Sequence, residues 1–193
     1  MNLPRADVAA QQASTTPVNS ATAIFAGGCF WCMQPPFDHA PGIVKTVVGY
    51  TGGSASDATY DKVSGHTTQH RESIQVTYDP TKISYDQLLE IFWRNINPTQ
   101  ADGQFHDIGL SYQAAIYYGS ESEQKAAEVS KENLGKSGKF DKPIVTGILP
   151  ATKFYPAEDY HQKYYLKNPA AYEAYHVGSG RTAFVERIWG KAR

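Results

Sequence analysis

The 193-residue sequence has only two cysteines, no long apolar run and no excess of charge of either sign. Lys and Arg number 18 and Asp and Glu number 19, so the formal net charge is -1, and no basic stripe is visible. This balance argues against nucleic acid and anionic membranes as partners. No apolar run approaches the ~20 residues that a membrane span needs, and residues 1–20 lack the apolar segment of a signal peptide. We therefore expect a soluble protein.

The N-terminal residues differ in composition from the rest. Residues 1–21 are rich in Ala, Ser, Thr, Gln and Pro and have no period, which predicts a mobile tail or the remnant of a removed signal. The length of residues 22–193 suits a single catalytic domain with one core. The sparse use of cysteine favours the reducing cytoplasm, and an exported, periplasmic protein with its signal removed is the alternative.

The two cysteines, Cys29 and Cys32, directly follow a pair of glycines and the apolar run Ala23–Ala26. The run predicts a buried strand, and the glycine pair predicts a turn. In a helical turn after it, Cys29 would lie near unpaired backbone N–H groups, which stabilise a thiolate. Helix positions three apart lie ~5–6 Å from each other between Cβ atoms, close to disulfide geometry. Cys29 is thus interpreted as a nucleophile and Cys32 as its resolving partner.

Three other interpretations of the cysteine pair stay open at this stage. His66 and His70 have the spacing of a second ligand pair for zinc, although no second cysteine pair exists and bulky residues between the cysteines would crowd a metal. A CxxC sequence is also the thioredoxin signature. The simplest alternative is a pair of inert core cysteines.

Strands are predicted where β-branched or alternating residues occur between turn residues. They are Ala23–Ala26, Ile43–Tyr50, Glu72–Tyr78, Ala114–Tyr118 and Ile144–Leu149. In the third of these, Glu72 falls on the same face as Ile74, Val76 and Tyr78 because side chains alternate along a strand. A carboxylate there lies at the rim of the sheet or takes part in chemistry.

Two main helices are predicted. A capping box of Ser84 and Gln87 begins the helix Tyr85–Arg94, whose Leu88, Leu89 and Phe92 face inward. Ser120 and Glu123 cap a second helix, which runs to about Leu134 and is stopped by Gly135 and Gly138. Short helical turns are expected at the cysteines, near Tyr60 and at Glu158–Tyr165, and the helix at the cysteines is expected to kink or restart near Pro35. Loops are expected over the twenty residues after Gly53, over Asn97–Leu110 and near the C-terminus, where Phe184–Trp189 packs back.

This order of elements predicts an α+β fold. The expected architecture is a two-layer sandwich of a mixed β-sheet with helices, with a split β-α-β, ferredoxin-like core and long loops. A thioredoxin topology would also place the CxxC after a first strand, so the order of elements alone leaves both folds open.

Several spaced motifs resemble those of the A-type peptide methionine sulfoxide reductases. Gly28-Cys29-Phe30-Trp31 matches the signature G-C-F-W of this family, and the resemblance covers nearly the whole chain after the tail. Further matches, in the order of the family, are Gly49-Tyr50-Thr51-Gly52-Gly53, His70 and Glu72 before Tyr78-Asp79-Pro80, and Phe154-Tyr155-Pro156-Ala157-Glu158-Asp159-Tyr160-His161-Gln162. The sequence is therefore identified as a member of this family, in the subtype that carries G-C-F-W-C.

The resemblance implies a role for each of eight residues. Cys29 matches the nucleophile, Cys32 the resolving cysteine and Glu72 the carboxylic acid of the site. Phe30 and Trp31 match the wall that receives the substrate methyl group. The residues that fall where the family places two tyrosine hydroxyls and an aspartate near the sulfoxide oxygen are Tyr60, Tyr112 and Asp107.

Two positions depart from the family pattern. Gln34 stands where similar members have Glu, so that a carboxylate expected at the site is missing. Gln113 stands where an Arg commonly follows Tyr112, which affects the surroundings of the site and not its centre. His70, Asp79 and the Glu158–Asp159 pair are expected to be structural.

The resemblance also implies the reaction. Cys29 would take the oxygen of methionine S-sulfoxide, in proteins and as the free amino acid, and become a sulfenic acid that Cys32 converts to a disulfide. Thioredoxin would reduce that disulfide, and no metal or bound organic cofactor would be required. The alternatives are a thioredoxin-like disulfide oxidoreductase and a protein that only binds methionine-rich partners through its aromatic face.

Overall fold

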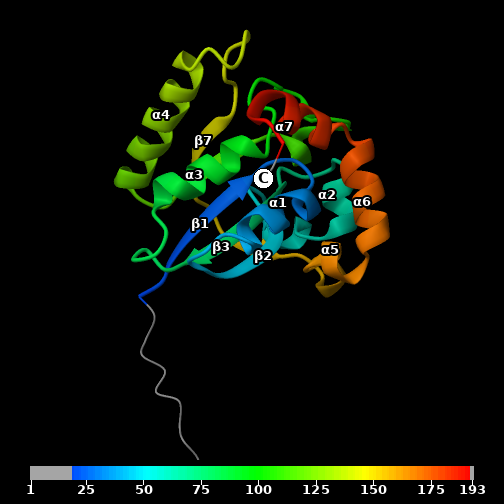
Figure 1. The fold of residues 1–193 in the computed structure, drawn as a ribbon. Helices are drawn as coiled ribbons and strands as arrows, with labels where there is room; N and C mark the ends of the chain where they lie inside the picture. The colour runs from blue at the N-terminus through cyan, green and yellow to red at the C-terminus, as the bar shows by residue number, and fades with distance from the viewer. Residues whose placement is uncertain (1–18, 192–193) are drawn as a thin grey trace, which may run out of the picture.

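The computed structural model describes residues 19–191, and its centre is a six-stranded mixed sheet with the order β7-β6-β1-β3-β2-β8 (Figure 1). The predicted tail lies almost entirely outside the described residues. The strands of the sheet are β1 (Ala21–Ala26), β2 (Ile43–Thr51), β3 (Arg71–Tyr78), β6 (Ala115–Tyr118), β7 (Gly147–Pro150) and β8 (Phe154–Pro156). A separate hairpin consists of β4 (Gly103–Gln104) and β5 (Asp107–Ile108).

The helices lie between and after these strands. The α-helices are α1 (Phe30–Asp38), α2 (Tyr60–Ser64), α3 (Tyr85–Arg94), α4 (Glu121–Lys136), α5 (Tyr164–Lys167), α6 (Pro169–Gly178) and α7 (Arg181–Trp189). Short 3-10 turns cover Ala55–Asp57, Leu110–Tyr112 and Asp159–His161. None of the helices in residues 19–191 is long and apolar enough to cross a membrane.

The first three strands form the predicted split β-α-β unit. Strand β3 pairs antiparallel with β1 on one side and with β2 on the other, so β1 and β2 run parallel and α1 connects them. Strand β6 extends the sheet antiparallel to β1, and β7 adds parallel to β6. The mixed sheet with helices confirms the predicted α+β class.

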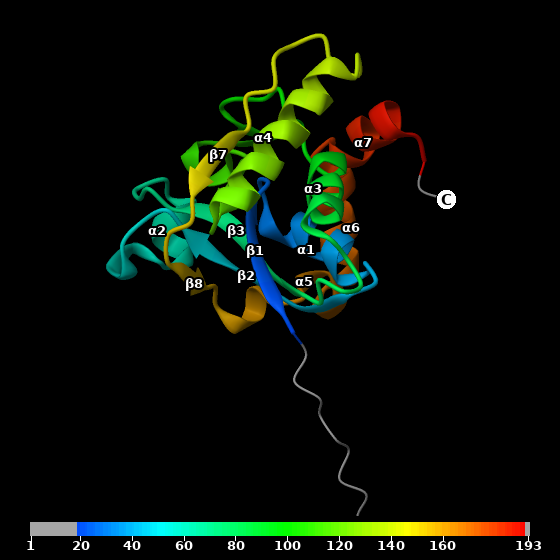
Figure 2. The same ribbon diagram turned by 90° about the vertical axis from the view of Figure 1, so that its left-hand side faces the viewer.

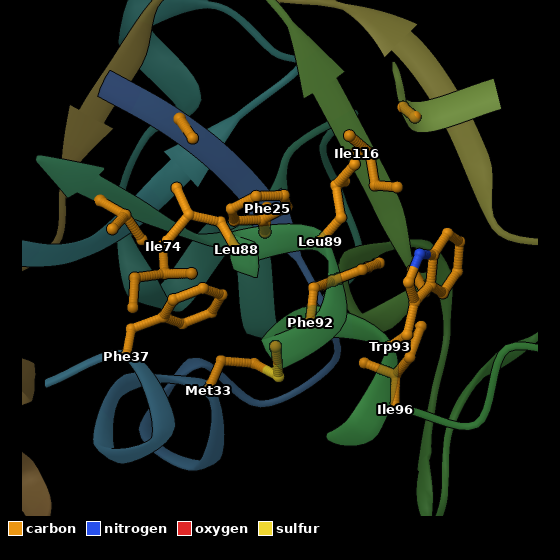
Figure 3. Close-up of a cluster of buried hydrophobic side chains, with 14 of the residues drawn as sticks. Phe25, Met33, Phe37, Ile74, Leu88, Leu89, Phe92, Trp93, Ile96 and Ile116 are labelled. Carbon is orange, nitrogen blue, oxygen red and sulfur yellow. The ribbon is translucent and has the colours of Figure 1, made fainter. Parts of the chain in front are cut away.

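The main core lies between one face of the sheet and the helices α1, α3 and α4. Figure 3 shows Phe25 of β1, Ile74 of β3 and Ile116 of β6 facing Phe37 of α1 and Phe92 of α3. The aromatic rings stack, with 5.3 Å between the centroids of Phe25 and Phe37 and 5.2 Å between those of Phe25 and Phe92. This packing holds α1 against β1, and the cysteines lie at the turn between these two elements.

The predicted helix Tyr85–Arg94 is confirmed with its capping box. The Ser84 hydroxyl accepts from the Gln87 backbone N–H at 3.2 Å, and the Gln87 side chain accepts from the Ser84 N–H at 2.9 Å. Leu88, Leu89 and Phe92 are all buried, as their spacing predicted.

Several predicted boundaries were wrong. The helix does not restart at Pro35, since α1 continues through Pro35 and Pro36 to Asp38. Because the two prolines lack N–H groups, only carbonyl groups of the first turn are left without a helical hydrogen bond. The second main helix passes Gly135 and ends at Lys136. The last predicted strand begins at Gly147 and not at Ile144. The expected loop 97–110 contains the hairpin of β4 and β5.

The C-terminal region differs most from its prediction. It was expected to be mainly loop, but it contains β8, α6 and α7, and Phe184–Trp189 packs back as part of a helix. Figure 1 shows α6 and α7, in orange and red, at the side of the molecule where α1 and α2 lie, and Figure 2 shows the same ribbon turned by 90°. These helices therefore reach the region of the cysteines.

Candidate active site

The cysteines lie at the turn that joins β1 to α1. Gly28 has a φ of +81°, and a Cβ at this position would lie 2.5 Å from Cβ of Gln104, so only glycine fits there. Cys29 is the N-cap residue of α1. Its carbonyl oxygen accepts a hydrogen bond from the Cys32 N–H at 3.1 Å, which closes the first turn of the helix. Both cysteines are free thiols in this structure. The strand, turn and helix predicted from the sequence are thus present.

A cavity of about 220 Å³ opens beside this turn. Every predicted site residue except Cys32 lines it, together with one residue that the sequence did not indicate. The lining residues are Cys29, Phe30, Trp31, Tyr60, Glu72, Asp107, Tyr112 and Tyr175. They come from α1, α2, β3, β5, the 3-10 turn Leu110–Tyr112 and α6, so the long loops of the fold converge at this point.

Glu72 is a buried carboxyl group at the beginning of β3. It pairs across the sheet with Tyr50, on the face where Ile74 pairs with Val48, which confirms the predicted orientation. Its side chain accepts a hydrogen bond from the Phe30 N–H at 3.0 Å. Burial, and then the nearby Cys29, raise the pKa of Glu72 well above its ordinary value, and this outweighs the hydrogen bond from Phe30. Glu72 therefore keeps its proton far above the pH at which an exposed glutamate ionises.

The environment of the two thiols differs from the sequence-based expectation. Cys29 is 6% exposed and Cys32 1%, so both thiols are buried. Burial raises the pKa of Cys29 well above its ordinary value, and no hydrogen bond caps the helix through its side chain. The pKa of Cys32 is lowered, first by a hydrogen bond from Cys29 and then, against the effect of burial, by the charge of Arg181. The helix N-terminus alone therefore does not activate Cys29.

Tyr60 and Tyr112 bring hydroxyl groups to the cavity. The Tyr60 backbone N–H donates to Oε1 of Glu158 at 2.9 Å, and Oε2 of Glu158 accepts from the Tyr50 hydroxyl at 2.7 Å, which fixes the start of α2. Burial is the largest cause that raises the pKa of Tyr60 to about 12 and shifts that of Tyr112 upward as well. Both phenols are therefore protonated at neutral pH and can donate hydrogen bonds.

Phe30 and Trp31 form an apolar wall that other aromatic residues hold in place. The Trp31 Nε1–H donates to Nδ1 of His161 at 3.0 Å, and its ring stacks on Tyr164 with 3.9 Å between centroids. The Phe30 ring lies 5.0 Å from His161 and 5.9 Å from Tyr50, centroid to centroid. The wall is therefore rigid on the side opposite the cavity. His161 belongs to a motif that carried the family resemblance, but its contact with Trp31 had no signal in the sequence.

Asp107 and Tyr175 meet at the far side of the cavity. Asp107 begins β5, and its Oδ2 accepts a hydrogen bond from the Tyr175 hydroxyl. The same hydroxyl lowers the pKa of Cys29, although burial outweighs this effect. Sequence reasoning missed Tyr175 because residues 169–178 were expected to be loop, and nothing distinguished this residue from the other twelve of the 13 tyrosines.

The two departures from the family pattern lie outside the cavity. Gln34 is fully buried; its Nε2 donates to Oγ1 of Thr46 at 3.0 Å, and its Oε1 accepts from the Lys163 N–H at 2.8 Å. The expectation that position 34 belongs to the site was therefore wrong. Gln113 accepts from Nη2 of Arg71 at 3.2 Å and also does not line the cavity.

The histidines considered for zinc form other contacts. His70 accepts from the Gly53 N–H at 3.2 Å and its Nε2 lies 2.8 Å from the Ser54 carbonyl oxygen. Nδ1 of His66 lies 3.0 Å from the Ser111 hydroxyl. Residues 19–191 contain no group of three or more His, Cys, Asp or Glu that could hold a metal ion.

The mixed sheet and its helices place a buried thiol beside a protonated carboxyl group, an arrangement suited to an enzyme that combines a sulfur nucleophile with an acid. Comparison with known proteins is more specific, because the family model of peptide methionine sulfoxide reductase matches residues 21–193. The chain belongs to the peptide methionine sulfoxide reductase family, as its motifs predicted.

The relatives cover most of this chain. Peptide methionine sulfoxide reductase MsrA of Bacillus pumilus is 56% identical over 167 residues, which are 86% of this chain and 94% of the relative. The protein of the same name in Bacillus subtilis is 54% identical over 168 residues, or 87% of this chain and 95% of the relative. Among solved structures, Mxr1 from Saccharomyces cerevisiae in reduced form has a TM-score of 0.75 and 32% identity, covering 80% of this chain and 89% of that chain.

Proposed function

We propose that this chain reduces methionine S-sulfoxide, in proteins and as the free amino acid, with Cys29 as nucleophile, Glu72 as acid and Cys32 as resolving thiol. The observation that carries the proposal is the cavity of about 220 Å³ in which Cys29, the protonated Glu72 and two tyrosine hydroxyls face an apolar wall. A methyl sulfoxide combines a small apolar group with a strongly polar oxygen. The cavity offers a surface of each kind.

In the first step the sulfur of Cys29 attacks the sulfur of the sulfoxide. Oxide is a poor leaving group, so the oxygen needs a proton as the charge on it grows. Glu72 lines the same cavity, and burial raises its pKa, so the carboxyl group carries a proton to give. The protonated oxygen then passes from the methionine sulfur to Sγ of Cys29, as the S–O bond of the sulfoxide and the S–S bond made by the attack both break. Methionine leaves with the electron pair of that S–S bond, and Cys29 becomes a sulfenic acid. The proton of the Cys29 thiol replaces the one that Glu72 has donated, which balances the step.

Charge on the oxygen also needs hydrogen-bond donors. Tyr60 and Tyr112 are protonated at neutral pH and line the cavity from two different segments. Donors fixed by the fold stabilise developing charge without having to reorganise during the reaction. Asp107 also lines the cavity and accepts a hydrogen bond from the Tyr175 hydroxyl, so it contributes to the polar side of the cavity and is not assigned a bond of its own to this oxygen.

The substrate methyl group fits against Phe30 and Trp31. Because His161 and Tyr164 hold Trp31, the wall keeps its shape when the site is empty. A rigid apolar wall on one side and hydroxyl groups on the other make the cavity chiral, which supports selectivity for one sulfoxide epimer. The family resemblance indicates the S epimer.

In the second step Cys32 attacks the sulfenic acid, a disulfide forms and water is released. Positions three apart at the start of a helix need little movement to be joined. Thioredoxin is the external reductant that the family resemblance indicates. Because both cysteines are buried in the reduced state, thioredoxin would have to reach the disulfide through the cavity at Cys29. The proposed cycle uses no metal and no bound organic cofactor.

The decisive experiment is a single turnover with equimolar methionine sulfoxide, in which methionine release and free thiols are counted together. The wild type should release methionine and lose two thiols, while Cys29→Ser should release none. A wild type that keeps both thiols and releases no methionine would show that the cysteines are inert.

Cys32→Ser distinguishes this reaction from disulfide exchange of the thioredoxin type. The proposal predicts that this variant still completes one turnover, because Cys32 acts only after methionine has left. A thioredoxin-like oxidoreductase would show no oxidation of Cys29 by the sulfoxide in either protein.

A further inference from the structure

Arg181 is a buried cation without an anionic partner. Its side chain is 1% exposed, and it forms no salt bridge with any carboxylate in the part of the chain that the structure describes. The guanidinium donates instead to the carbonyl oxygens of Gly27, at 2.9 Å, and Asn95, and to Sδ of Met33 at 3.5 Å. Its Nε has no partner among the described residues. Burying an uncompensated charge is costly, so this one calls for an explanation.

The backbone at the start of α7 directs this side chain inward. Gly180 has a φ of +85°, which allows the sharp turn between α6 and α7. The Arg181 N–H donates to the Ser179 hydroxyl at 3.3 Å, and the guanidinium lies 4.5 Å from the centroid of the Phe105 ring. Arg181 is the only residue of α7 that is buried. The helix therefore places a single side chain in the interior, and that side chain is charged.

The guanidinium lies against the turn that carries both cysteines. It bonds to Gly27 before the turn and to Met33 after it, and a Cβ at Gly28 would lie 3.0 Å from its Nη2. Neither Arg181 nor Cys32 lines the cavity. The positive charge is therefore packed against the turn from Gly27 to Met33, which contains Cys32, and lies outside the cavity.

We propose that Arg181 is a positioning residue for the second step: its bonds to Gly27 and Met33 fix the turn, and its unpaired charge favours ionisation of Cys32 for attack on the sulfenic acid. This inference rests on the proposed function. The Cys32 thiolate forms the S–S bond to Cys29 as the S–O bond of the sulfenic acid breaks. Hydroxide leaves and takes a proton from solvent to become water.

The charges around Cys32 support this role. The pKa of Cys32 is lowered by the hydrogen bond from Cys29 and by Arg181, against burial and the nearby carboxyl groups. The other titratable groups that face Cys32 or Arg181 are Glu72 of β3, Asp107 of β5 and Tyr172, Glu173 and His176 of α6. Unlike these groups, Arg181 carries a positive charge at every working pH.

The test measures the two steps in one reaction. Wild type, Arg181→Met, Arg181→Lys and, as a matched control, Arg187→Met are mixed with equimolar methionine sulfoxide between about pH 6 and about pH 10. Arg187 lies on the exposed side of the same helix. Methionine release reports the first step, and loss of the second thiol reports disulfide formation.

Arg181→Met should slow disulfide formation about ten-fold more than methionine release near neutral pH, because the thiolate fraction falls about ten-fold for each unit that the pKa of Cys32 rises. The difference should shrink as the pH rises, because Cys32 becomes ionised in both proteins once the pH exceeds its pKa. Arg181→Lys should recover most of the rate, and Arg187→Met should match the wild type. Equal slowing of both steps, or a difference that does not shrink with rising pH, would overturn the proposal.

A second measurement remains informative if Arg181→Met is poorly folded, or if methionine is not the product. In a Cys29→Ser background the pKa of Cys32 is titrated by its thiolate absorbance, with Arg181 and with Lys or Met in its place. The Met variant should have a higher pKa and the Lys variant one near the parent. An unchanged pKa in both would contradict the proposal, whereas absence of methionine release from the wild type would count against the proposed function alone.

Discussion

The two sides of the Cys29–Cys32 turn offer opposite electrostatic environments. The cavity side, defined by Glu72, Asp107 and Tyr175 around Cys29, combines burial with carboxyl groups and keeps protons bound. The core side, defined by Arg181 against Gly27 and Met33, has a cation and no carboxylate partner. Two thiols three residues apart can therefore differ in pKa, because burial dominates at Cys29, whereas at Cys32 the hydrogen bond from Cys29 and the charge of Arg181 outweigh burial and the nearby carboxyl groups.

This difference suits a reaction with two unlike steps. The first step needs an acid that is still protonated when substrate arrives, and the cavity side provides it. The second step needs a thiolate to attack a sulfenic acid, and the core side favours that ionised form. Substitutions on one side of the turn at a time separate the two contributions.

The largest effect is expected for Glu72→Gln. Gln retains the size of the side chain and can accept from the Phe30 N–H, but it has no acidic proton, so methionine release should slow by about 10²- to 10⁴-fold. Substrate binding should change little. Rapid-mixing measurement of methionine release in a single turnover tests this, and a rate equal to that of the wild type would exclude Glu72 as the acid.

The next effect concerns the hydroxyl groups of the cavity. Replacing Tyr60 and Tyr112 together by Phe should slow methionine release by about 10²-fold, since the oxygen then loses fixed donors while Glu72 still protonates it. Disulfide formation from a preformed sulfenic acid should keep its rate. If the double variant slows the second step as much as the first, the hydroxyl groups stabilise the fold of the site and not the developing charge.

Gln34→Glu should affect stability and not chemistry. The amide donates to Thr46, whose hydroxyl donates in turn to Asp38 at 2.6 Å. A carboxylate in its place would keep the bond from the Lys163 N–H but lose the donor to Thr46, and it would add a second buried negative charge near Asp38, which already pairs with the Lys163 ammonium. The expected loss is about 1–3 kcal/mol of unfolding free energy near neutral pH. It should shrink as pH falls and the new carboxyl group is protonated. Urea unfolding at two pH values measures this, and unchanged stability would contradict the buried amide's role.

The smallest effect is the pH dependence of stability at Glu72. The folded-state pKa is raised, so the folded protein holds a proton that the unfolded chain releases above about pH 4.3. The contribution of Glu72 to the free energy of unfolding is therefore fully present below that pH, and it is lost as the pH rises through the folded-state pKa. Glu72→Gln should remove this pH dependence. The melting temperature of the variant should therefore rise relative to that of the wild type as the pH increases. Parallel curves for the two proteins would indicate a carboxyl group that is ionised in the fold.

The cavity side could be predicted from the sequence more fully than the core side. The glycine pair fixed the turn at Cys29, and the alternation of residues 72–78 put Glu72 on the same face as Ile74 and Val76. These features depend on local rules, the φ of a glycine and the two-residue period of a strand. Tyr60, Asp107 and Tyr112 were placed by family motifs, since each lies in a loop that no periodicity describes.

The core side had no such local signal. Helix α6 has no buried residue and α7 has only Arg181, so neither carries the apolar stripe by which a helix is recognised. Tyr175 and Arg181 reach the cysteines only because these helices pack across residues more than a hundred positions earlier. The expectation that the Cys29 thiolate is stabilised was wrong for a related reason. Burial by distant segments raises the pKa of Cys29 and outweighs the effect of the helix N-terminus.

The most direct test of the account is a single turnover of Cys32→Ser with an equimolar methionine sulfoxide peptide, followed by trapping of sulfenic acid. The account predicts that methionine is released and that the trap labels Cys29. Release of no methionine, or release without a label on Cys29, would contradict it.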